Sequence, residues 1–273
     1  MFLAVDVGGT KTLVASFTDS GKISEHVKFK TPPSYPAFIK QLEEMLFGLS
    51  HDTFKFACVA VPGVVDRKTG VGKDFGNLAW KNVPIKADVE KLVSCQVTVE
   101  NDANLAGLSE ARYIIHDYIK VLYVTISTGI GTGIITHGTI DSDFADSEPG
   151  HMMVQYNDRM QNWEDIAAGS AIVQRYGKFA ADINDKKTWK EICHRLAIGM
   201  NSIIATIEPD VIVIGGSVGA HFKKYGSILT QELKKYSTPL TPVPPILQAK
   251  NPEQAVVYGC YQLAKDTYEA THK

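Results

Sequence analysis

Residues 2–18, FLAVDVGGTKTLVASFT, decide the fold, because a glycine pair interrupts two runs of strand-forming residues. Branched and aromatic side chains are frequent in residues 2–6 and 12–18, as is typical of β-strands. Gly8 and Gly9 permit the backbone conformations of a tight hairpin turn. The turn leads into a second strand, whereas a dinucleotide site needs a helix there, and the chain has no GxxxxGK[ST] loop. We predict a β-hairpin whose turn presents backbone N–H groups to phosphate.

Two further glycine-rich segments follow predicted strands. Residues 127–133 (STGIGTG) lie between the strand-like runs 120–126 and 134–136, and residues 215–217 (GGS) follow the apolar run 211–214. Each segment alone is more simply explained as a tight turn, where glycine is favoured at positive φ. Three such turns, each after a strand, favour phosphate binding by hairpins and suggest an internal duplication.

The other elements are predicted from the spacing of apolar residues. A strand at residues 96–100 precedes a helix that runs through residue 111, and side chains typical of helix N-caps lie at the junction. Apolar residues repeat every three to four positions in the other predicted helices. These comprise a helix that begins at residue 38 and helices at 163–179, 188–207 and 253–270, with a further strand at 56–61.

The composition excludes several classes of protein. With 273 residues, of which 44% are hydrophobic and 21% charged, the chain is long enough for two lobes. Its net charge of -2 and the absence of a Lys/Arg run disfavour nucleic acid as a partner. Without such a run, the sequence also shows no extended basic stripe that could hold a long polyanion. The apolar runs are too short to span a membrane.

The cysteines and the N-terminus indicate the compartment. Cys58, Cys95, Cys193 and Cys260 are far apart, and none forms a CxxC pair. The chain opens directly on an apolar run that ends at an acidic residue, without the features of an export signal. We expect a soluble cytoplasmic protein with no membrane partner.

Seven motifs along the chain resemble those of the ROK sugar kinases, a branch of the actin-like ATPase fold. DVGGTKT (6–12) resembles the phosphate hairpin DxGGT[KN], and ENDAN (100–104) resembles the catalytic motif of the family. The remaining matches are VPGVVD (61–66) with PGxxD, NLAW (77–80) with the sugar-side loop NLxW, TGIGTG (128–133) with the second phosphate turn, EPGH (148–151) with ExGH, and GGSV (215–218) with the adenosine-side turn.

The resemblance implies an α/β protein with the two-lobed actin-like ATPase (ribonuclease H-like) fold, with mixed sheets and a central cleft. The small N-terminal lobe would comprise residues 1–113, completed by a C-terminal helix at 253–273. Residues 114–252 would form the large C-terminal lobe. Closure of the cleft would keep water from competing with the sugar.

The resemblance also makes Asp102 the general base. A carboxylate at the end of a strand accepts the proton of a hydroxyl group as its oxygen attacks phosphorus. Its position alone favours a helix N-cap, but Asn101 and Asn104 are alternative capping residues. Asp6 would lie close to Mg²⁺ or its water ligands.

Substrate-binding residues follow from the same motifs. Glu164 is included because WEDIAAG (163–169) aligns with the family segment LExYASG. Taken alone, His151 is more simply interpreted as a partly buried histidine bonded to a carbonyl group, but the match to ExGH favours a place in the sugar site. The implied sugar ligands are Gly63, Asn77, Asn101, Asp102, Glu148, His151 and Glu164. The implied ATP-binding residues are Asp6, Gly8, Gly9, Thr10, Lys11, Thr128, Gly129, Gly131, Thr132, Gly215, Gly216 and Ser217.

The chain departs from the family after His151, where many ROK proteins carry the zinc-binding cluster CxCGxxGC. No cysteine lies between Cys95 and Cys193, so we predict no zinc site of this type. The zinc-free polyphosphate glucokinases share this departure, which keeps polyphosphate open as an alternative donor.

We predict an ATP-dependent glucokinase that acts on the 6-hydroxyl group and serves glycolysis. Mannose, fructose and N-acetylhexosamines stay open as substrates, as does a sugar-binding sensor without turnover. A sensor would need neither Asp102 nor Asp6. A family repressor would need an N-terminal DNA-binding domain before the phosphate hairpin. Homodimerisation is implied by the family.

Overall fold

The computed structural model describes residues 1–51, 53–252 and 254–272. The chain divides into two compact units. Unit 1 comprises Met1–Ser109 and Gln254–Lys273, and unit 2 comprises Glu110–Glu253. The division lies within helix α3 (Asp102–Tyr113).

Unit 1 contains a five-stranded sheet in the order β3-β2-β1-β4-β8. The first three strands are antiparallel, which confirms the predicted N-terminal hairpin, while β4 and β8 run parallel to β1. Alternate side chains of β1 point to opposite faces, as in any strand. The strands are β1 (Phe2–Val7), β2 (Lys11–Phe17), β3 (Ile23–Lys30), β4 (Phe56–Val61) and β8 (Val97–Asn101).

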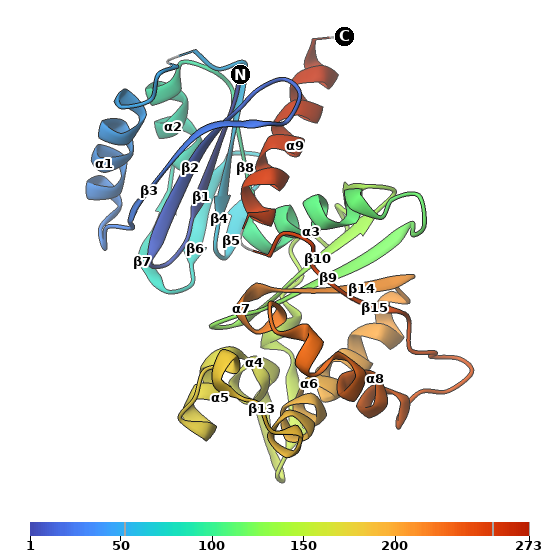
Figure 1. The fold of residues 1–273 in the computed structure, drawn as a ribbon. Coiled ribbons are helices and arrows are strands. Elements are labelled where there is room, and N and C mark those ends of the chain that lie inside the picture. Colours follow the sequence, from blue (N-terminus) through green and yellow to red (C-terminus); the bar gives the residue numbers. More distant parts are fainter. Residues whose placement is uncertain (52, 253, 273) are drawn as a thin grey trace. The chain divides into compact units, whose positions relative to one another are not determined.

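Helices cover both faces of this sheet. Leu3 and Val5 pack in one core with α1 (Tyr35–Phe47) and α2 (Ile85–Val93). Phe2 and Ala4 pack in a second core with the C-terminal helix α9. Figure 1 shows α9, in red, lying along the sheet, although its sequence is far from the strands that it contacts. The predicted C-terminal helix is confirmed as α9 (Ala255–Thr271).

A small antiparallel sheet, in the order β5-β6-β7, follows β4 in unit 1. Trp80 of this sheet is buried, and its indole N–H donates a hydrogen bond to the Pro33 carbonyl oxygen, 3.0 Å away. The sheet is therefore fixed against the segment that leads into α1. Its strands are β5 (Val64–Asp66), β6 (Val71–Phe75) and β7 (Leu78–Val83).

Unit 2 repeats the arrangement of unit 1, as an internal duplication predicts. Its five-stranded sheet has the order β11-β10-β9-β14-β15, with β9, β10 and β11 antiparallel and β14 and β15 parallel to β9. Its core includes α6 (Lys186–Ile207) and α8 (Gly226–Lys234). The strands are β9 (Lys120–Ile126), β10 (Ile130–Thr136), β11 (Thr139–Ile140), β14 (Val211–Gly215) and β15 (Ile246–Gln248).

Two predictions for unit 2 were wrong. The helix expected at residues 163–179 is two helices, α4 (Trp163–Ala167) and α5 (Gly169–Tyr176), because Ala168 has an extended backbone with ψ 168°. The glycine segment expected to form a turn to residue 133 is a turn at residues 127–129 only. Strand β10 begins at Ile130, where cross-strand pairing with Ile126 starts. Ladder hydrogen bonds override the turn preference of the later glycines.

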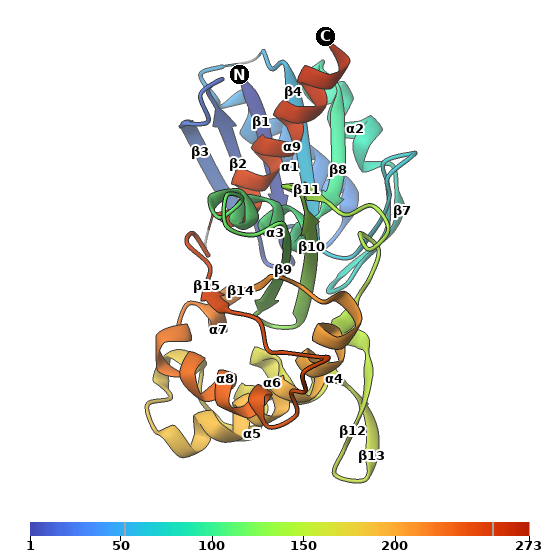
Figure 2. The same ribbon diagram turned by 90° about the vertical axis from the view of Figure 1, so that its right-hand side faces the viewer.

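A hairpin occupies the place of the missing cysteine cluster. Strands β12 (Met153–Tyr156) and β13 (Arg159–Asn162) pair antiparallel. Asn157 and Asp158 form the two-residue turn with φ of 50° and 58°, as the favoured hairpin turn requires. Figure 2 shows the hairpin projecting from the rest of unit 2. In the described part of the chain, no helix combines the length and the apolar character needed to cross a membrane.

Candidate active site

The N-terminus of α3 is capped by Asn101. Its side-chain Oδ1 accepts hydrogen bonds from the backbone N–H groups of Ala103, at 2.8 Å, and Asn104, at 3.2 Å. These bonds satisfy donors that have no partner within the helix. Of the two alternative capping residues, Asn101 takes this role, so the cap does not require the carboxylate of Asp102 beside it.

Glu100 anchors the same junction from inside unit 1. Glu100 is only 5% exposed, and its carboxylate accepts two hydrogen bonds from the guanidinium of Arg67, at 2.7 and 2.6 Å. The backbone N–H of Asn101 and the side-chain amide of Asn104 donate to Glu100 Oε1, at 2.8 and 2.9 Å. This network of charge-assisted bonds fixes the end of β8 next to Asp102.

Asp6 and Asp102 influence each other electrostatically. Asp6 lies near the carboxyl end of β1, in register with Ala60 of β4, which is itself paired with Glu100 of β8. Burial, and to a smaller extent the charge of Asp102, raise the pKa of Asp6 to about 7, although Lys28 opposes the increase. Parallel strands thus bring the two acidic residues to one edge of the unit 1 sheet.

Gly63 and Asn77 also belong to unit 1. The side-chain Nδ2 of Asn101 donates to the carbonyl oxygen of Gly63 at 3.0 Å. Gly63 has φ 107°, and a Cβ atom there would lie 2.5 Å from the Asp74 carbonyl oxygen, so the turn requires glycine. Asn77 is exposed, and its Cβ would contact a Cβ placed on Gly9 at 3.5 Å. Asn77 therefore lies against the first glycine turn.

The first glycine turn is held to the edge strand by Thr31. The Thr31 hydroxyl donates to the Gly8 carbonyl oxygen at 2.7 Å, and the Thr31 N–H donates to the Thr10 carbonyl oxygen at 3.0 Å. Beside this turn is a hollow of about 380 Å³, which we call the lysine hollow. It is lined by Thr10, Lys11, Lys28, Phe29 and Lys30.

In unit 2 the structure brings Glu148, His151 and Glu164 together. His151 Nδ1 lies 3.5 Å from Glu164 Oε1, and Glu164 Oε2 accepts a hydrogen bond from the Ile130 N–H at 3.2 Å. Burial raises the pKa of Glu148, His151 lowers it, and Glu164 raises it. A Cβ on Gly129 would lie 2.7 Å from Glu164 Oε2, so the second glycine turn adjoins these polar side chains.

The second glycine turn is bonded to the start of α5. The Gly169 N–H donates to the Ser127 carbonyl oxygen at 2.7 Å, and the Ser170 hydroxyl donates to the Thr128 carbonyl oxygen at 2.6 Å. These bonds explain why the helix restarts at Gly169. They hold the backbone of residues 127–129 in a fixed position.

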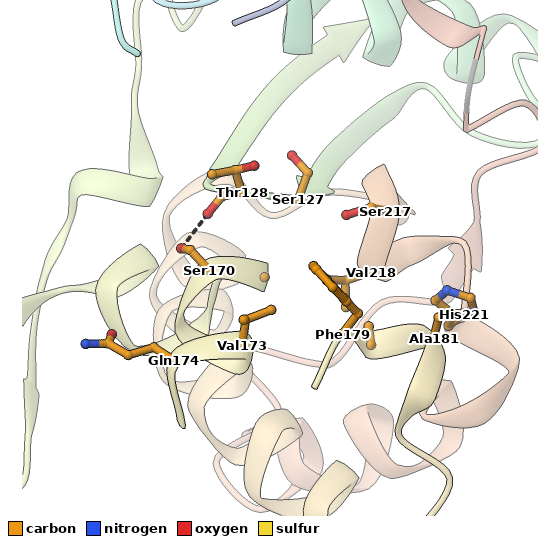
Figure 3. Close-up of a pocket in the computed structure, with 12 residues that line it drawn as sticks. Ser127, Thr128, Ser170, Val173, Gln174, Phe179, Ala181, Ser217, Val218 and His221 are labelled. Atoms are coloured by element: carbon orange, nitrogen blue, oxygen red, sulfur yellow. Dashed lines mark hydrogen bonds between the residues drawn. The ribbon is translucent and has the colours of Figure 1, made fainter. Parts of the chain in front are cut away.

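A pocket of about 540 Å³ opens beside this turn, entirely within unit 2. Figure 3 shows the hydroxyl-bearing side chains of Ser127, Thr128 and Ser217 on one side of the space and apolar side chains on the other. This size and this apolar lining with a few polar groups are typical of small-molecule sites. The lining is completed by Gly169, Ser170, Val173, Gln174, Phe179, Ala180, Ala181, Val218 and His221.

The remaining residues predicted to bind the nucleotide lie in β10, at the end of β14 and at the start of α7. Gly215 ends β14, and Gly216, with φ 79°, begins α7 (Gly216–Gly219). A Cβ on Gly216 would lie 2.5 Å from the Ile126 carbonyl oxygen, so the third glycine turn packs on β9. Gly131 and Thr132 lie in β10. The Thr132 hydroxyl is buried and has no hydrogen-bond partner in the described part of the chain.

Sequence reasoning missed three groups of residues. Nothing local links Arg67 to Glu100, which is 33 positions away. The pocket residues of α5 and the segment after it carry no phosphate-type motif. Lys28 and Lys30 were detectable, because the HVKFK run alternates polar and apolar residues and so predicts lysines on one face of a strand. Among the described residues, no group of three or more His, Cys, Asp or Glu has an arrangement that could hold a metal ion.

Comparisons of the sequence and of the structure with known proteins both find proteins of the ROK family. A sequence profile of the ROK family matches residues 2–267. The N-acetyl-D-glucosamine kinase of Mannheimia succiniciproducens is 26% identical, and the match covers 96% of this chain and 99% of that protein.

Two solved structures share the fold. A ROK family glucokinase from Streptomyces griseus, in complex with glucose and AMPPNP, has a TM-score of 0.78 and 24% identity, over 97% of this chain and 99% of that one. An inorganic polyphosphate/ATP-glucomannokinase from Arthrobacter has a TM-score of 0.74 and 23% identity, over 99% of both chains. At these identities the likeness establishes the fold.

Proposed function

The chain belongs to the ROK family, and we propose that it is an ATP-dependent sugar kinase that phosphorylates the 6-hydroxyl group of glucose. One observation carries this proposal. Asn101 caps α3, so the helix cap does not require the adjacent Asp102 carboxylate, which stands at a strand-to-helix junction held by the Glu100 network. Such a carboxylate is suited to accept the hydroxyl proton as the sugar oxygen attacks the γ-phosphorus.

Asp6 fits a divalent cation. Its carboxylate offers hard oxygen atoms, and its ionisation is opposed by burial and by the charge of Asp102. A nearby cation would relieve both costs. When bound, Mg²⁺ supplies positive charge that neutralises the phosphate oxygens. We assign Asp6 to that ion, directly or through water.

We assign the nucleotide to the pocket of unit 2 and the phosphates to the glycine turns. The pocket volume of about 540 Å³ accommodates a nucleoside, and its apolar side excludes water from a base. The turn at residues 127–129 offers backbone N–H groups beside Thr128 and Ser217. The turn at residues 8–11 offers the same kind of groups in unit 1. The units would serve as the two functional domains of the kinase.

We assign sugar recognition to the residues that the family motifs predict. Glu148, His151 and Glu164 form a compact set of acceptors and a donor in unit 2. Asn77 and Gly63 contribute from unit 1, and Asn101 keeps one amide hydrogen for a ligand, because Gly63 accepts only the other. Mannose, fructose and N-acetylhexosamines are the competing acceptors, since the related proteins include an N-acetyl-D-glucosamine kinase.

A coupled assay with Mg²⁺ tests this proposal. Purified protein is supplied with glucose, mannose, fructose and N-acetylglucosamine in turn, and the release of ADP is measured with ATP as donor. We expect glucose to give the highest kcat/KM and ATP hydrolysis without sugar to be much slower. Sugar binding by calorimetry without turnover on any sugar would establish a sensor instead. Preference for another sugar would correct the acceptor alone.

We also propose, from family membership, that the protein is a cytoplasmic homodimer. Light scattering after size-exclusion chromatography gives its mass in solution. A mass near the 29.9 kDa of one chain would contradict the dimer.

A further inference from the structure

The segment between His151 and Glu164 determines how these two proposed sugar ligands meet. Residues 152–163 separate them in the sequence, yet His151 Nδ1 lies 3.5 Å from Glu164 Oε1. A flexible loop of this length would lose conformational entropy when its ends came together. Hairpin β12–β13 removes that freedom in advance, because its two strands pair along their whole length. The hairpin therefore holds the two ends of the segment close to each other.

The base of the hairpin closes directly beside the two ligands. The Trp163 N–H donates to the Met152 carbonyl oxygen at 2.9 Å, one step beyond the last residue pair of the two strands. Met152 follows His151 in the sequence, and Trp163 precedes Glu164. This backbone bond therefore fixes the main chain next to both ligands.

Trp163 anchors the base of the hairpin in the core of unit 2. Trp163 is fully buried and Val154 is 6% exposed, and both belong to the core that includes α6. The Trp163 indole N–H donates to the Arg195 carbonyl oxygen of α6 at 3.1 Å. A Cβ on Gly199 would lie 2.2 Å from the indole, so α6 leaves space for the ring at this position. The base of the hairpin is thus held from two directions.

The composition of the segment does not fit a structural metal site. Residues 152–162 contain no cysteine and no histidine, and Asp158 is their only acidic residue. A structural zinc ion is held by four ligands, most of them thiolates or imidazoles. Strand pairing and contacts with the core are therefore the interactions available to hold this segment.

We propose that hairpin β12–β13 holds His151 and Glu164 in the arrangement that binds the sugar, without a metal ion and with Trp163 as the positioning residue at its base. This inference rests on the proposed function, which assigns the two ligands to the sugar. Side chains that are held together before binding lose less conformational entropy when the sugar binds. A disrupted hairpin should therefore weaken sugar binding and spare the nucleotide pocket, which is lined by residues outside the hairpin.

Asn157→Pro tests the inference from the exposed turn at the projecting end of the hairpin (Figure 2). Asn157 has φ 50°, which proline cannot adopt because its ring fixes φ near about −65°. His137→Pro is the matched control, since His137 is exposed and has φ 53° in the two-residue turn between β10 and β11. Asp158→Gly is the conservative variant, because Asn-Gly is a preferred pair for this kind of turn.

The control is at least as severe as the test. The His137 N–H donates to the Ile119 carbonyl oxygen at 3.0 Å, and proline would remove this bond in addition to breaking the turn. A general loss of stability should therefore affect His137→Pro as much as Asn157→Pro. Thermal melting of both variants measures that loss.

Four measurements are made on each variant. Calorimetry without nucleotide gives the Kd of glucose, mannose, fructose and N-acetylglucosamine. The coupled assay gives KM for sugar, KM for ATP and kcat. Hydrogen exchange of the Trp163 N–H, followed by NMR, reports on the base of the hairpin. The zinc content of the wild type is measured, and its sugar binding is repeated with a zinc chelator in the absence of Mg²⁺.

We expect Asn157→Pro to raise the sugar Kd and KM at least about fivefold and to speed exchange of the Trp163 N–H, because the freed segment must be ordered again on binding. Its KM for ATP should change less than about twofold. His137→Pro and Asp158→Gly should keep the sugar Kd of the wild type. An equal loss of sugar binding in Asn157→Pro and His137→Pro would overturn the inference. So would one zinc ion per chain whose removal by the chelator abolishes sugar binding.

The two proposals fail in distinguishable ways. Sugar phosphorylation with the same KM for sugar in Asn157→Pro as in the wild type would refute the role of the hairpin and leave the kinase intact. Sugar binding that depends on the turn at Asn157, without turnover of any sugar, would refute the kinase and leave the role of the hairpin in place. A wild type that binds none of the four sugars would refute both.

Discussion

The two units have the same sheet and use it differently. In both, an antiparallel hairpin is followed by two parallel strands, and β4 and β14 occupy equivalent positions. Each of these strands is followed by a glycine at positive φ, Gly63 at 107° and Gly216 at 79°. The residues at the hairpin turns differ, however. Unit 1 has Asp6, Asp102 and three lysines near its turn, whereas the turn of unit 2 lies beside Glu164 and also borders a largely apolar pocket.

This difference shows how a duplicated scaffold acquires two roles. The strand order fixes where the turns and strand ends lie, and the side chains at those positions decide the chemistry. In unit 1, burial and the charge of Asp102 oppose the ionisation of Asp6, and a bound cation would offset both effects. In unit 2, the turn is bonded to α5 beside a pocket of about 540 Å³. We therefore expect unit 1 variants to change kcat and variants of the unit 2 pocket to change KM for the nucleotide.

The largest expected effect is that of Asp102→Asn. Its kcat should fall roughly 10²–10⁴-fold because the amide cannot accept the proton, and its KM for sugar should change little. Steady-state kinetics with the preferred sugar measure both constants. Asp117→Asn makes the same charge change at an exposed position and should keep the wild-type kcat. An unaltered kcat in Asp102→Asn would show that Asp102 is not the general base.

Arg67→Ala should cause the next largest change, a loss of about 3–5 kcal/mol in the free energy of unfolding. The substitution leaves the buried Glu100 carboxylate without its bidentate partner. Urea denaturation measures the loss. Lys81→Ala is the control, because it removes an exposed ion pair with Asp74 in the same small sheet and should cost less than about 1 kcal/mol. If both variants lost less than about 1 kcal/mol, the N–H of Asn101 and the side-chain amide of Asn104 would be sufficient partners for the Glu100 carboxylate.

Asp6→Asn should stabilise the protein at neutral and higher pH, by up to about 4 kcal/mol without cations or nucleotide. The folded-state pKa of Asp6, about 7, exceeds the ordinary value of 3.8, so the wild type loses stability as pH rises from about 4 through 7. The difference from the variant should vanish below pH 4 and be complete above pH 7. Urea melts across this range measure it. A constant difference would show that Asp6 does not titrate in this way.

Substitution of Ser217 by tryptophan should have the smallest effect, a rise of roughly tenfold in KM for ATP. The indole would fill part of the pocket in unit 2, while kcat at saturating ATP should stay within about threefold of the wild type. Kinetics with varied ATP distinguish the two constants, and Ser217→Ala serves as the small-residue control. A fall in kcat with an unaltered KM would contradict the division of roles between the units.

Much of the fold followed from local patterns. The N-terminal hairpin, the buried strands at residues 56–61 and 211–214 and the long helix α6 match their predictions closely, because alternation and helical periodicity record which face of an element is buried. The break at Ala168 was not predicted. It depends on hydrogen bonds from the start of α5 to residues 127 and 128, and no local pattern records such a distant contact.

The sequence by itself determined the family, the sheet-forming segments and the acidic and glycine residues that its motifs contain. Only the tertiary structure decided that Asn101 caps α3, that Arg67 neutralises Glu100, and that three lysines share one hollow. The physical reason is that motifs are contiguous, whereas pKa shifts, ion pairs and pockets arise from residues that the sheet register brings together from distant positions.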